Sequence, residues 1–417
     1  MIGRRPTSQT IIQQNAQGSE TLTSSLAYEP RGLVKSQTDA YGKTRSYSYT
    51  ALGQPSLATD ALGNQTGLQY DARGNLLQMK DANDHLYQFE YDRNDRLTKE
   101  TLPLGQTTRY TYDAAGNLDT RTDPNGNRSQ FQYDDANRLT RIDETNSQGN
   151  PLRTTLLTRD ATGNVIAWSD LDARRNQTTS ALLSYDDGGR KTSETVTYPQ
   201  GATLGYGYAY SLSGKKTRLT WADGTNIDYG YSTHGELETV TIPGEGSLSV
   251  NQFNWRVPAQ ITLPGGTQQN KHYDGLLDLT DLKVKNPGQQ ITLSLTDVYG
   301  KQQELKQTSR TDTAATGSSS TSASYGYDDE QRLINIQNDA GSESYTLDGV
   351  ANRIAHSQSG TWTFDANNRL LQQGSTTYEY DDNGNTTKKT EGGRITLYGY
   401  DSRNRLNEVR DGSNSNL

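Results

Sequence analysis

The chain of 417 residues contains no cysteine, which excludes disulfides, thiolate metal sites and cysteine nucleophiles. Its formal net charge of −8 disfavours a nucleic-acid partner, because phosphate binding needs clustered Lys and Arg. Apolar residues make up only 30% of the chain beside 26 tyrosines and 40 glycines, which argues against a thick conventional core. The residues after Met1 are polar and no window has the length of an apolar membrane helix, so we expect neither a Sec signal peptide nor a membrane span.

Residues 1–27 are polar, and we interpret them as an N-terminal segment or a partial repeat. From 28 to 142 the chain repeats itself, and each repeat carries the unit Tyr-Asp-x-x-Gly/Asn-Asn/Arg-Leu. The tyrosines that open the four clearest units recur every 21 residues, at Tyr70, Tyr91, Tyr112 and Tyr133. A fixed period of this size indicates a repeat architecture.

Each repeat contains two turn signals. In the first, Asp71 suits the opening of a type I turn and Gly74 suits the left-handed position that closes a bulged hairpin. The second is clearest at Asp123-Pro124-Asn125-Gly126, where proline pre-sets φ and glycine again takes the position of positive φ. The residues at the closing position of the first turn are Gly74, Gly116, Asn137, Gly163, Gly189, Gly214, Gly235, Gly384 and Asn404.

Between the turns, aromatic residues are spaced by two, as in Tyr110 and Tyr112, which places both rings on one face of a strand. No stretch shows sustained helical periodicity with caps. The sequence therefore predicts an all-β protein, an antiparallel β-meander whose repeats each supply two short strands and two tight turns.

The later chain departs from the regular period. Residues 143–312 read as degenerate repeats that remain β, and residues 313–324 form a Ser/Thr-rich run. We interpret that run as a long surface loop between strands, with a flexible linker as the alternative. The repeats resume over 325–417 at shorter spacings and end in a turn signal without a partner strand, as in a truncated array.

Structural roles in the repeat turns are expected for the motif residues. They are Tyr70, Asp71, Gly74, Asn75, Tyr91, Asp92, Tyr112, Asp113, Gly116, Asn117, Tyr133, Asp134, Asn137, Arg138, Tyr327, Asp328, Tyr380, Asp381, Gly384, Tyr400 and Asp401. Arginines that follow the turns, such as Arg96 and Arg138, are expected to pair with aspartates of adjacent repeats, each exposed pair contributing little.

No arrangement of residues predicts an enzyme, a cofactor site or a metal site. Acidic pairs such as Asp134-Asp135 recur because the turn recurs, and calcium binding by these turns lacks an EF-hand or nonapeptide pattern. The four histidines are far apart in sequence and lack partners at i, i+4. The four tryptophans, Trp168, Trp221, Trp255 and Trp362, fit either sheet packing, which we favour, or sugar-stacking platforms.

The repeated Tyr-Asp unit, joined to Asp-Pro-Asn-Gly-Asn at 123–127 and recurring over 327–406, resembles the Rhs/YD-repeat family. This family includes bacterial Rhs proteins, wall-associated polymorphic toxins, the C components of Tc toxins and teneurins. The resemblance implies a long β-sheet that spirals into a hollow β-shell, of which this chain would be a part. In bacterial members the shell encloses a C-terminal toxin domain.

The sequence departs from the toxin-type pattern, which ends the core with Asp-Pro-x-Gly-Leu beside an aspartyl self-cleavage site. Here Asn127 follows Asp123-Pro124-Asn125-Gly126 in the middle of the array, so no protease residue is carried over. The resemblance implies a structural shell segment that encapsulates and helps deliver a toxin domain absent from this chain. Its implied partners are the rest of the shell and the enclosed toxin cargo, with secretion or delivery by a specialised bacterial system. The alternative is a module that binds glycans or a cell surface through exposed aromatics.

Overall fold

The computed structural model describes residues 7–15 and 18–412 and is built almost entirely of β-strands. By the packing of the backbone the chain divides into two units, unit 1 with Met1–Leu86, Tyr231–Thr239 and Glu245–Phe364, and unit 2 with Tyr87–Gly230, Val240–Gly244 and Asp365–Leu417. Each unit therefore combines a segment from the first half of the chain with a segment from the second half.

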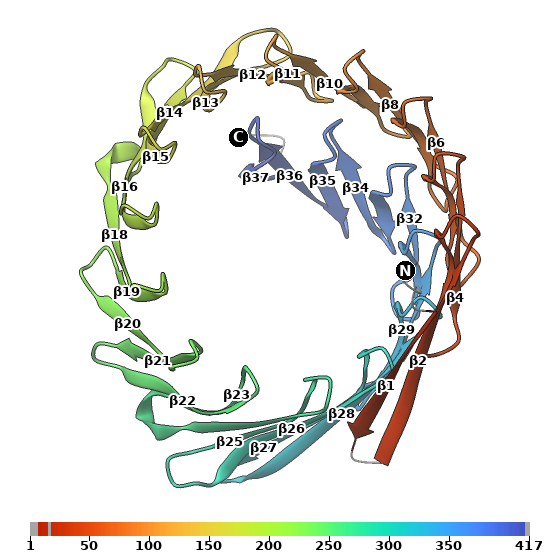
Figure 1. The fold of residues 1–417 in the computed structure, drawn as a ribbon, viewed down its shortest axis with the longest axis vertical. Coiled ribbons are helices and arrows are strands. Elements are labelled where there is room, and N and C mark those ends of the chain that lie inside the picture. Colours follow the sequence, from red (N-terminus) through yellow and green to blue (C-terminus); the bar gives the residue numbers. More distant parts are fainter. Residues whose placement is uncertain (1–6, 16–17, 413–417) are drawn as a thin grey trace, which may run out of the picture. The chain divides into compact units, whose positions relative to one another are not determined.

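Unit 1 contains two runs of strands (Figure 1). The first run is β1 (Ser8–Asn15), β2 (Gly18–Tyr28), β3 (Val34–Thr38), β4 (Thr44–Tyr49), β5 (Pro55–Thr59), β6 (Gln65–Tyr70) and β7 (Leu76–Lys80). The second run is β22 (Gly246–Asn254), β23 (Val257–Thr262), β24 (Gln268–Tyr273), β25 (Leu279–Lys285), β26 (Ile291–Tyr299), β27 (Leu305–Ala314), β28 (Gly317–Tyr327), β29 (Leu333–Asn338), β30 (Gly341–Leu347), β31 (Arg353–His356) and β32 (Gly360–Phe364). A 3₁₀ turn, Pro264–Gly266, precedes β24.

Unit 2 also contains two runs. The first is β8 (Leu86–Tyr91), β9 (Leu97–Thr101), β10 (Thr107–Tyr112), β11 (Leu118–Thr122), β12 (Arg128–Tyr133), β13 (Leu139–Thr145), β14 (Pro151–Arg159), β15 (Val165–Asp172), β16 (Gln177–Tyr185), β17 (Lys191–Thr197), β18 (Thr203–Tyr210), β19 (Lys216–Thr220) and β20 (Asn226–Tyr231), with a 3₁₀ turn at Pro199–Gly201. The second is β33 (Leu370–Gln373), β34 (Thr376–Tyr380), β35 (Thr386–Glu391), β36 (Arg394–Tyr400) and β37 (Leu406–Asp411). Strand β21 (Leu237–Ile242) contributes residues to both units.

Consecutive strands pair antiparallel, and the pairing slips by one residue just before each Tyr-Asp turn. Between β10 and β11, Thr111 faces Thr120 but Tyr112 faces Leu118. Within the turn, the N–H of Asp113 donates to the Asn117 carbonyl at 2.9 Å, and the N–H of Gly116 donates to the Asp113 carbonyl at 3.1 Å. This is the bulged hairpin that the turn residues predict.

The closing position of these turns has the left-handed conformation that the sequence predicts. Gly74, Gly116 and Gly384 have φ of 99°, 94° and 88°, and Asn137 has φ of 58°. The Asp-Pro-Asn-Gly turn has the same hydrogen-bond pattern, with Gly126 at φ 82°. The turns of both signals share this hydrogen-bond pattern, although within β10–β12 only the Tyr-Asp hairpin has the slip in pairing. The predicted all-β antiparallel meander is confirmed.

Neither unit has a conventional apolar core. Among the described residues, Leu22 and Ala181 are the buried hydrophobic side chains, and no large side chain is fully buried. Several of the most buried side chains are polar, namely Asp81, Thr108, Thr120, Asp123, Glu144, Thr154 and Thr155. Half-buried tyrosine and leucine side chains spread along the sheet take the place of a central core, as the low apolar content led us to expect.

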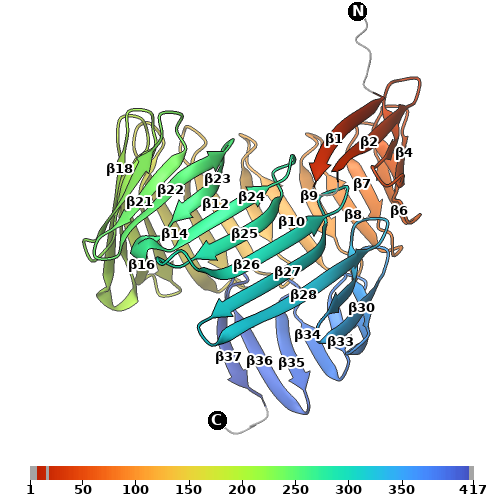
Figure 2. The same ribbon diagram turned by 90° about the horizontal axis from the view of Figure 1, so that it is seen from below.

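The Ser/Thr-rich run 313–324 is not a surface loop. Strand β27 continues to Ala314 and β28 begins at Gly317, so these two strands form a long hairpin joined by two residues (Figure 2). The register pairs Thr311 with Ser320, and their hydroxyls are hydrogen-bonded at 2.9 Å. Hydroxyl side chains paired across strands stabilise a ladder, so a polar composition did not prevent strand formation.

The predicted N-terminal partial repeat and the predicted truncated end lie partly outside the described residues. Where it is described, the N-terminal segment forms the β1–β2 hairpin, in which Ser8 pairs with Ser25. The residues after Met1 on which the signal-peptide expectation rests, and residues 413–417, lie outside the described residues.

Candidate functional site

The repeat turns that contain the motif aspartate are held by its carboxylate, as at Asp71. Oδ1 of Asp71 accepts hydrogen bonds from the N–H groups of Arg73 at 2.9 Å and Asn75 at 2.8 Å. Oδ2 of the same carboxylate accepts from Nδ2 of Asn75 at 2.9 Å. These bonds hold the pKa of Asp71 below its ordinary value, with the Asn75 side chain as the largest cause. The turn therefore depends on an ionised aspartate.

In the regular Tyr-Asp turns the residue four positions after the aspartate is Asn or Arg, and both satisfy Oδ2. Arg96 Nε donates to Asp92 Oδ2 at 2.7 Å, and Arg138 Nε to Asp134 Oδ2 at 2.8 Å. The expectation that these arginines pair with aspartates of adjacent repeats is wrong, because the partner is the aspartate of the same turn. The i, i+4 spacing across a tight turn brings the two groups within reach.

The link between adjacent repeats comes from the remaining atoms of these arginines and from the motif tyrosines. Nη1 of Arg369 donates to the Asp381 carbonyl of the next turn at 3.0 Å, and its guanidinium lies 5.0 Å from the centre of the Tyr380 ring. Cation–π contacts of this kind contribute about 0.5–1 kcal/mol at exposed sites.

Motif tyrosines donate their hydroxyls to the leucine carbonyl that ends the preceding repeat unit. The pairs are Tyr112 to Leu97 at 2.8 Å, Tyr133 to Leu118 at 3.0 Å, Tyr327 to Leu305 at 2.8 Å and Tyr380 to Leu370 at 2.7 Å. Sequence reasoning assigned these tyrosines to cross-strand packing and missed their hydroxyls. The remaining tyrosines of the predicted motif set, Tyr70, Tyr91 and Tyr400, also end their strands immediately before the turn aspartate.

In unit 1, turns from the two runs of strands meet side chain to side chain, and we call this contact the unit 1 seam. Lys43 Nζ lies 2.8 Å from Asp329 Oδ1, and Arg45 forms an ion pair with Glu330. The N–H of Ala61 donates to Glu330 Oε1 at 2.5 Å. The seam therefore joins basic residues and backbone amides of the first run to acidic turn residues of the second.

The unit 1 seam also contains Asn83 Nδ2, which donates to Asp348 Oδ2 at 2.8 Å, and Gln302 Nε2, which donates to Asp39 Oδ2 at 2.6 Å. Thus the aspartate carboxylates that close turns also accept bonds from the opposing run. Gly349 allows this approach, because a Cβ there would lie 2.7 Å from the Ala82 carbonyl oxygen.

One turn of the unit 1 seam lacks the motif aspartate. Gly300 stands at that position, and the hydroxyl of Tyr41 from the other run fills the space. This hydroxyl accepts from the N–H of Lys301 at 2.8 Å and donates to Glu304. A side chain from a segment about 260 residues away thus replaces the missing cap.

Unit 2 has its own seam, formed by the turns of its first run and the Tyr-Asp turns of β33–β37. Nδ2 of Asn125 donates to Asp381 Oδ2 at 3.0 Å, and its N–H donates to Asn383 Oδ1 at 3.1 Å. Nδ2 of Asn383 in turn donates to Asp123 Oδ2 at 2.8 Å. The Asp-Pro-Asn-Gly turn is therefore a docking position as well as a hairpin.

The unit 2 seam ends in a buried ion-pair cluster around Glu144, whose side chain is 6% exposed. Arg403 Nε lies 2.7 Å from Glu144 Oε1, and Arg403 Nη2 donates to Thr155 Oγ1 at 2.7 Å. Arg153 lies 3.3 Å from the same carboxylate. Burial raises the pKa of Glu144, but hydrogen bonds from Ser402 and Arg403 outweigh burial and leave the pKa below its ordinary value.

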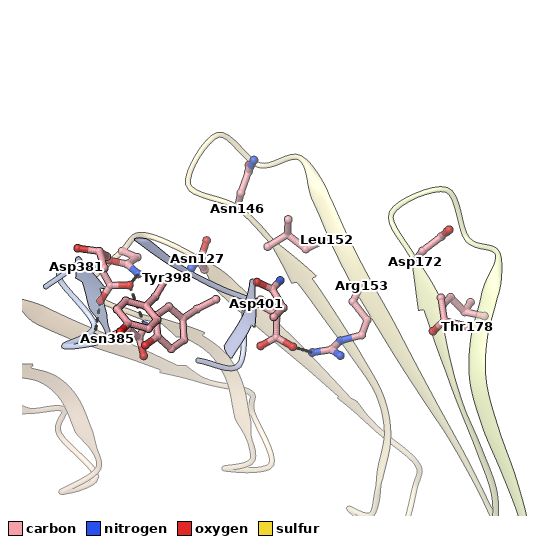
Figure 3. A pocket seen from close by; sticks show the side chains of 16 residues that line it. Asn127, Asn146, Leu152, Arg153, Asp172, Thr178, Asp381, Asn385, Tyr398 and Asp401 are labelled. Carbon is pink, nitrogen blue, oxygen red and sulfur yellow. Dashed lines mark hydrogen bonds and ion pairs between the residues drawn. The ribbon is translucent and has the colours of Figure 1, made fainter. Parts of the chain in front are cut away.

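A cavity of about 780 Å³ lies beside this cluster within unit 2 (Figure 3). Its lining combines Asn127, Asn146, Arg153 and Asp172 from the first run with Tyr398 and Asp401 from the second. Arg153 Nη2 approaches Asp401 Oδ2 at 3.9 Å across the cavity wall. The cavity therefore lies where the two docked runs begin to separate.

The described residues contain no group of three or more His, Cys, Asp or Glu that could hold a metal ion. Within residues 7–15 and 18–412, no helix has the length and apolarity needed to cross a bilayer. The chemistry that the site can perform is docking of turn against turn through carboxylates, amides and guanidinium groups.

Sequence reasoning did not identify the seam residues Tyr41, Asn125, Glu144, Glu330 and Asn383. A signal was present, because Asp328-Asp-Glu330, Asp365-Ala-Asn367 and Asp381-Asp-Asn383 carry a side-chain oxygen two positions after the aspartate. The turns at Asp113 and Asp134 carry alanine there, at Ala115 and Ala136. The turns at Asp348 and Asp401 also dock, yet they carry Val350 and Arg403 at this position, so the signal covers only some of the docking turns.

Comparison with protein-family models matches two of them. The RHS Repeat model matches residues 28–64, 56–86, 91–128 and 120–150, and the Teneurin YD-shell model matches residues 248–417. None of the curated proteins compared matches the chain.

Among solved structures, the chain is similar to Tc toxin assemblies. TcdB2-TccC3 without its hypervariable C-terminal region is 13% identical, with a TM-score of 0.65 over 97% of this chain and 24% of that chain. The Tc holotoxin pore of Photorhabdus luminescens is 16% identical, with a TM-score of 0.63 over 98% of this chain and 22% of that one. TcdB2-TccC3-TEV is 14% identical, with a TM-score of 0.62 over 96% of this chain and 22% of that one.

The chain thus spans about a quarter of the length of these solved chains, and at this identity the likeness concerns the fold. The repeat motif, the bulged hairpins and the two family models, which together match both halves of the chain, point to one family. The chain belongs to the Rhs/YD-repeat family.

Proposed function

We propose that the chain is a structural, non-enzymatic segment of an Rhs-type YD-repeat shell that encapsulates and helps deliver a toxin domain. One observation carries this proposal: in each unit, later Tyr-Asp turns dock against turns that lie far earlier in the chain. This docking joins two runs of a one-layer sheet through the turns at the ends of their strands. A wall built this way encloses space without an apolar core, and both units lack such a core among the described residues. The similar Tc assemblies have this fold.

The proposed partners are the remainder of a YD-repeat shell and an enclosed toxin cargo. The protein itself would be secreted or delivered by a specialised bacterial secretion system. The test is small-angle X-ray scattering of the purified chain with circular dichroism. A solid protein of this length has a radius of gyration of about 22 Å. We expect a clearly larger value with a β-rich spectrum, because a wall holds its mass away from the centre. A value near 22 Å contradicts the proposal.

A second candidate function is binding of glycans by exposed aromatics, and Trp255 favours it. This side chain is 86% exposed at the tip of the β22–β23 hairpin, in a left-handed conformation with φ of 57° that bulky residues rarely adopt. Of the two roles considered for the tryptophans, packing does not fit this one. A glycan array should show binding that Trp255→Ala abolishes and Trp362→Phe retains, and an array without signal removes this candidate.

A further inference from the structure

At some docked turns of both units, charged residues meet residues of opposite charge. In unit 1, the acidic Asp329 and Glu330 meet Lys43 and Arg45. In unit 2, the neutral Asn383 meets the neutral Asn125, and the basic Arg403 meets the acidic Glu144. Asp329, Glu330 and Arg403, at the second or third position of their docking turns, therefore each meet a residue of opposite charge.

Further along the first run of unit 2, the turn Asp172–Asn176 is capped in the same way as the docked turn at Asp123. Oδ1 of Asp172 accepts from the N–H groups of Arg174 and Asn176, both at 2.8 Å, and Arg175 takes the left-handed position with φ of 65°. Residues 173–177 are nevertheless fully exposed, whereas the docked turn at Asp123 is buried or half-buried throughout. Neither Arg174 nor Arg175 forms a close ion pair among the residues that the structure describes; at longer range Arg174 attracts Asp172 and Arg175 attracts Asp143.

A second exposed feature of unit 2 lies beside this turn. All six residues of β37 are exposed, with Leu406 at 53% and Val409 at 59%. The strand pairs with β36 on one side, and within the described part of the chain no strand pairs with its other edge. Asn407 of β37 and Asp172 both line the 780 Å³ cavity. An unpaired edge, an unoccupied receiving turn and the cavity are thus contiguous with the unit 2 seam.

We propose that this region binds a further Tyr-Asp hairpin, its strand pairing with β37 and its turn docking on Asp172–Asn176. Because Arg174 and Arg175 form the receiving tip, the incoming turn carries Asp or Glu at its second and third positions. The inference rests on the proposed function, since its partner is another part of a YD-repeat shell. An unpaired edge supplies backbone donors and acceptors, and the charged turn supplies selectivity.

The test uses the full chain and a fluorescein-labelled, disulfide-cyclised hairpin peptide that copies residues 323–338, with the turn Tyr-Asp-Asp-Glu-Gln-Arg. A matched hairpin has arginine in place of the second and third turn residues. Fluorescence anisotropy at low salt should show binding of the acidic hairpin at least tenfold tighter than that of the arginine hairpin. The double variant Arg174→Glu, Arg175→Glu should reverse this preference.

Val409→Lys should weaken binding of both hairpins at least threefold, while Leu52→Lys, at an exposed hydrophobic residue of unit 1, should leave binding unchanged. Equal binding of the two hairpins, no effect of the charge reversal or no binding by folded protein overturns the proposal. Displacement of the hairpin by an oligosaccharide mixture also overturns it, because the cavity is then a sugar site. The outcome is independent of the scattering test, so failure of one proposal can be told from failure of the other.

Discussion

In the regular repeats, the hydroxyl of Tyr112 donates to the Leu97 carbonyl of the preceding unit while Arg96 lies 4.4 Å from the ring centre. Two residues of one motif therefore contact the next at a single tyrosine. Tyr112→Phe should destabilise strands β9–β11 by about 1 kcal/mol, the typical net contribution of one hydrogen bond. Hydrogen exchange of these strands measures the effect, with Tyr110→Phe, which removes a hydroxyl without a partner, as the control. Equal effects of the two variants would contradict this role.

Asp278 occupies the position four residues after Asp274, where the regular turns hold Asn or Arg, so a second carboxylate faces Asp274. Burial raises the pKa of Asp278 above its ordinary value, Gln303 opposes this with a hydrogen bond, and Asp274 adds to the rise. A carboxyl with a raised folded-state pKa stabilises the fold below its unfolded pKa, and this stability is lost as the pH rises through the folded value. The site therefore costs stability at neutral pH.

Asp278→Asn should restore the missing donor and stabilise unit 1 at pH 7 by about 0.5–1.5 kcal/mol. The gain should shrink as the pH falls toward 4, because protonation of Asp278 at its raised pKa relieves the cost of the second carboxylate. Thermal unfolding at both pH values measures this difference. The reverse change Asn117→Asp removes a 3.0 Å bond to Asp113 and should reproduce the defect in an ordinary turn. A gain independent of pH would exclude the titration of Asp278 as its cause.

The residue-scale features differ in how far the sequence could show them. The left-handed position at Gly116 and the capping by Asp113 are local, because they depend on residues within one turn. The hydrogen bond from the Tyr112 hydroxyl to the Leu97 carbonyl depends on how adjacent repeats are offset in space. The length of the repeat in sequence does not determine this offset. The predicted partner of Arg96 was wrong for a similar reason. The sequence places an aspartate both in the same turn and in the adjacent repeats, and it does not indicate which of them Arg96 contacts.

At the scale of elements, each strand is short and gains its order from its neighbours, as in repeat proteins generally. In the regular repeats the positions of the hairpins followed from turn chemistry. The β27–β28 hairpin did not, because composition alone separates a Ser/Thr-rich loop from a Ser/Thr-rich strand poorly. Its register, with Thr313 opposite Ser318, becomes visible only through pairing.

The turn at Gly300 allows a test of element docking. A Cβ at this position overlaps the Tyr41 hydroxyl and the Glu304 carboxylate. Gly300→Ala should therefore displace Tyr41 and speed hydrogen exchange in residues 39–45 at least tenfold. Gly205→Ala is the control, because its Cβ meets Thr195 Oγ1 at an ordinary 3.7 Å. Unchanged exchange after Gly300→Ala would show that Tyr41 does not hold the two runs together.

At the scale of the whole molecule, docking joins segments that are far apart in sequence, as with Arg403 and Glu144, 259 residues apart. No local pattern could predict which turn meets which, because the two runs have different repeat spacings and the match depends on accumulated strand lengths. What the sequence does carry is the chemistry of each docking turn, as in Glu330 and Asn383. The fold class was therefore predictable, and the pairing of the seam was not.

The Glu144 cluster predicts how the unit 2 seam responds to acid. A carboxyl with a lowered folded-state pKa contributes stability above its unfolded pKa, about 4.3 for Glu, and this stability is lost as the pH falls through the folded value. Docking of the Asp401 turn should therefore hold at neutral pH and weaken below about pH 4.

Glu144→Gln should weaken the same docking at pH 7, because it leaves Arg403 and Arg153 without their shared carboxylate. Breaking a buried ion pair on one side costs about 3 kcal/mol, so exchange of the amides in 401–411 should rise by about a hundredfold. Glu90→Gln, at an exposed pair with Lys99, is the matched control and should change exchange little. If Glu144→Gln leaves 401–411 protected, the docking does not depend on this charge. If it opens 401–411 without affecting β9–β12, the seam is a separable contact that holds the later run of strands on the earlier one.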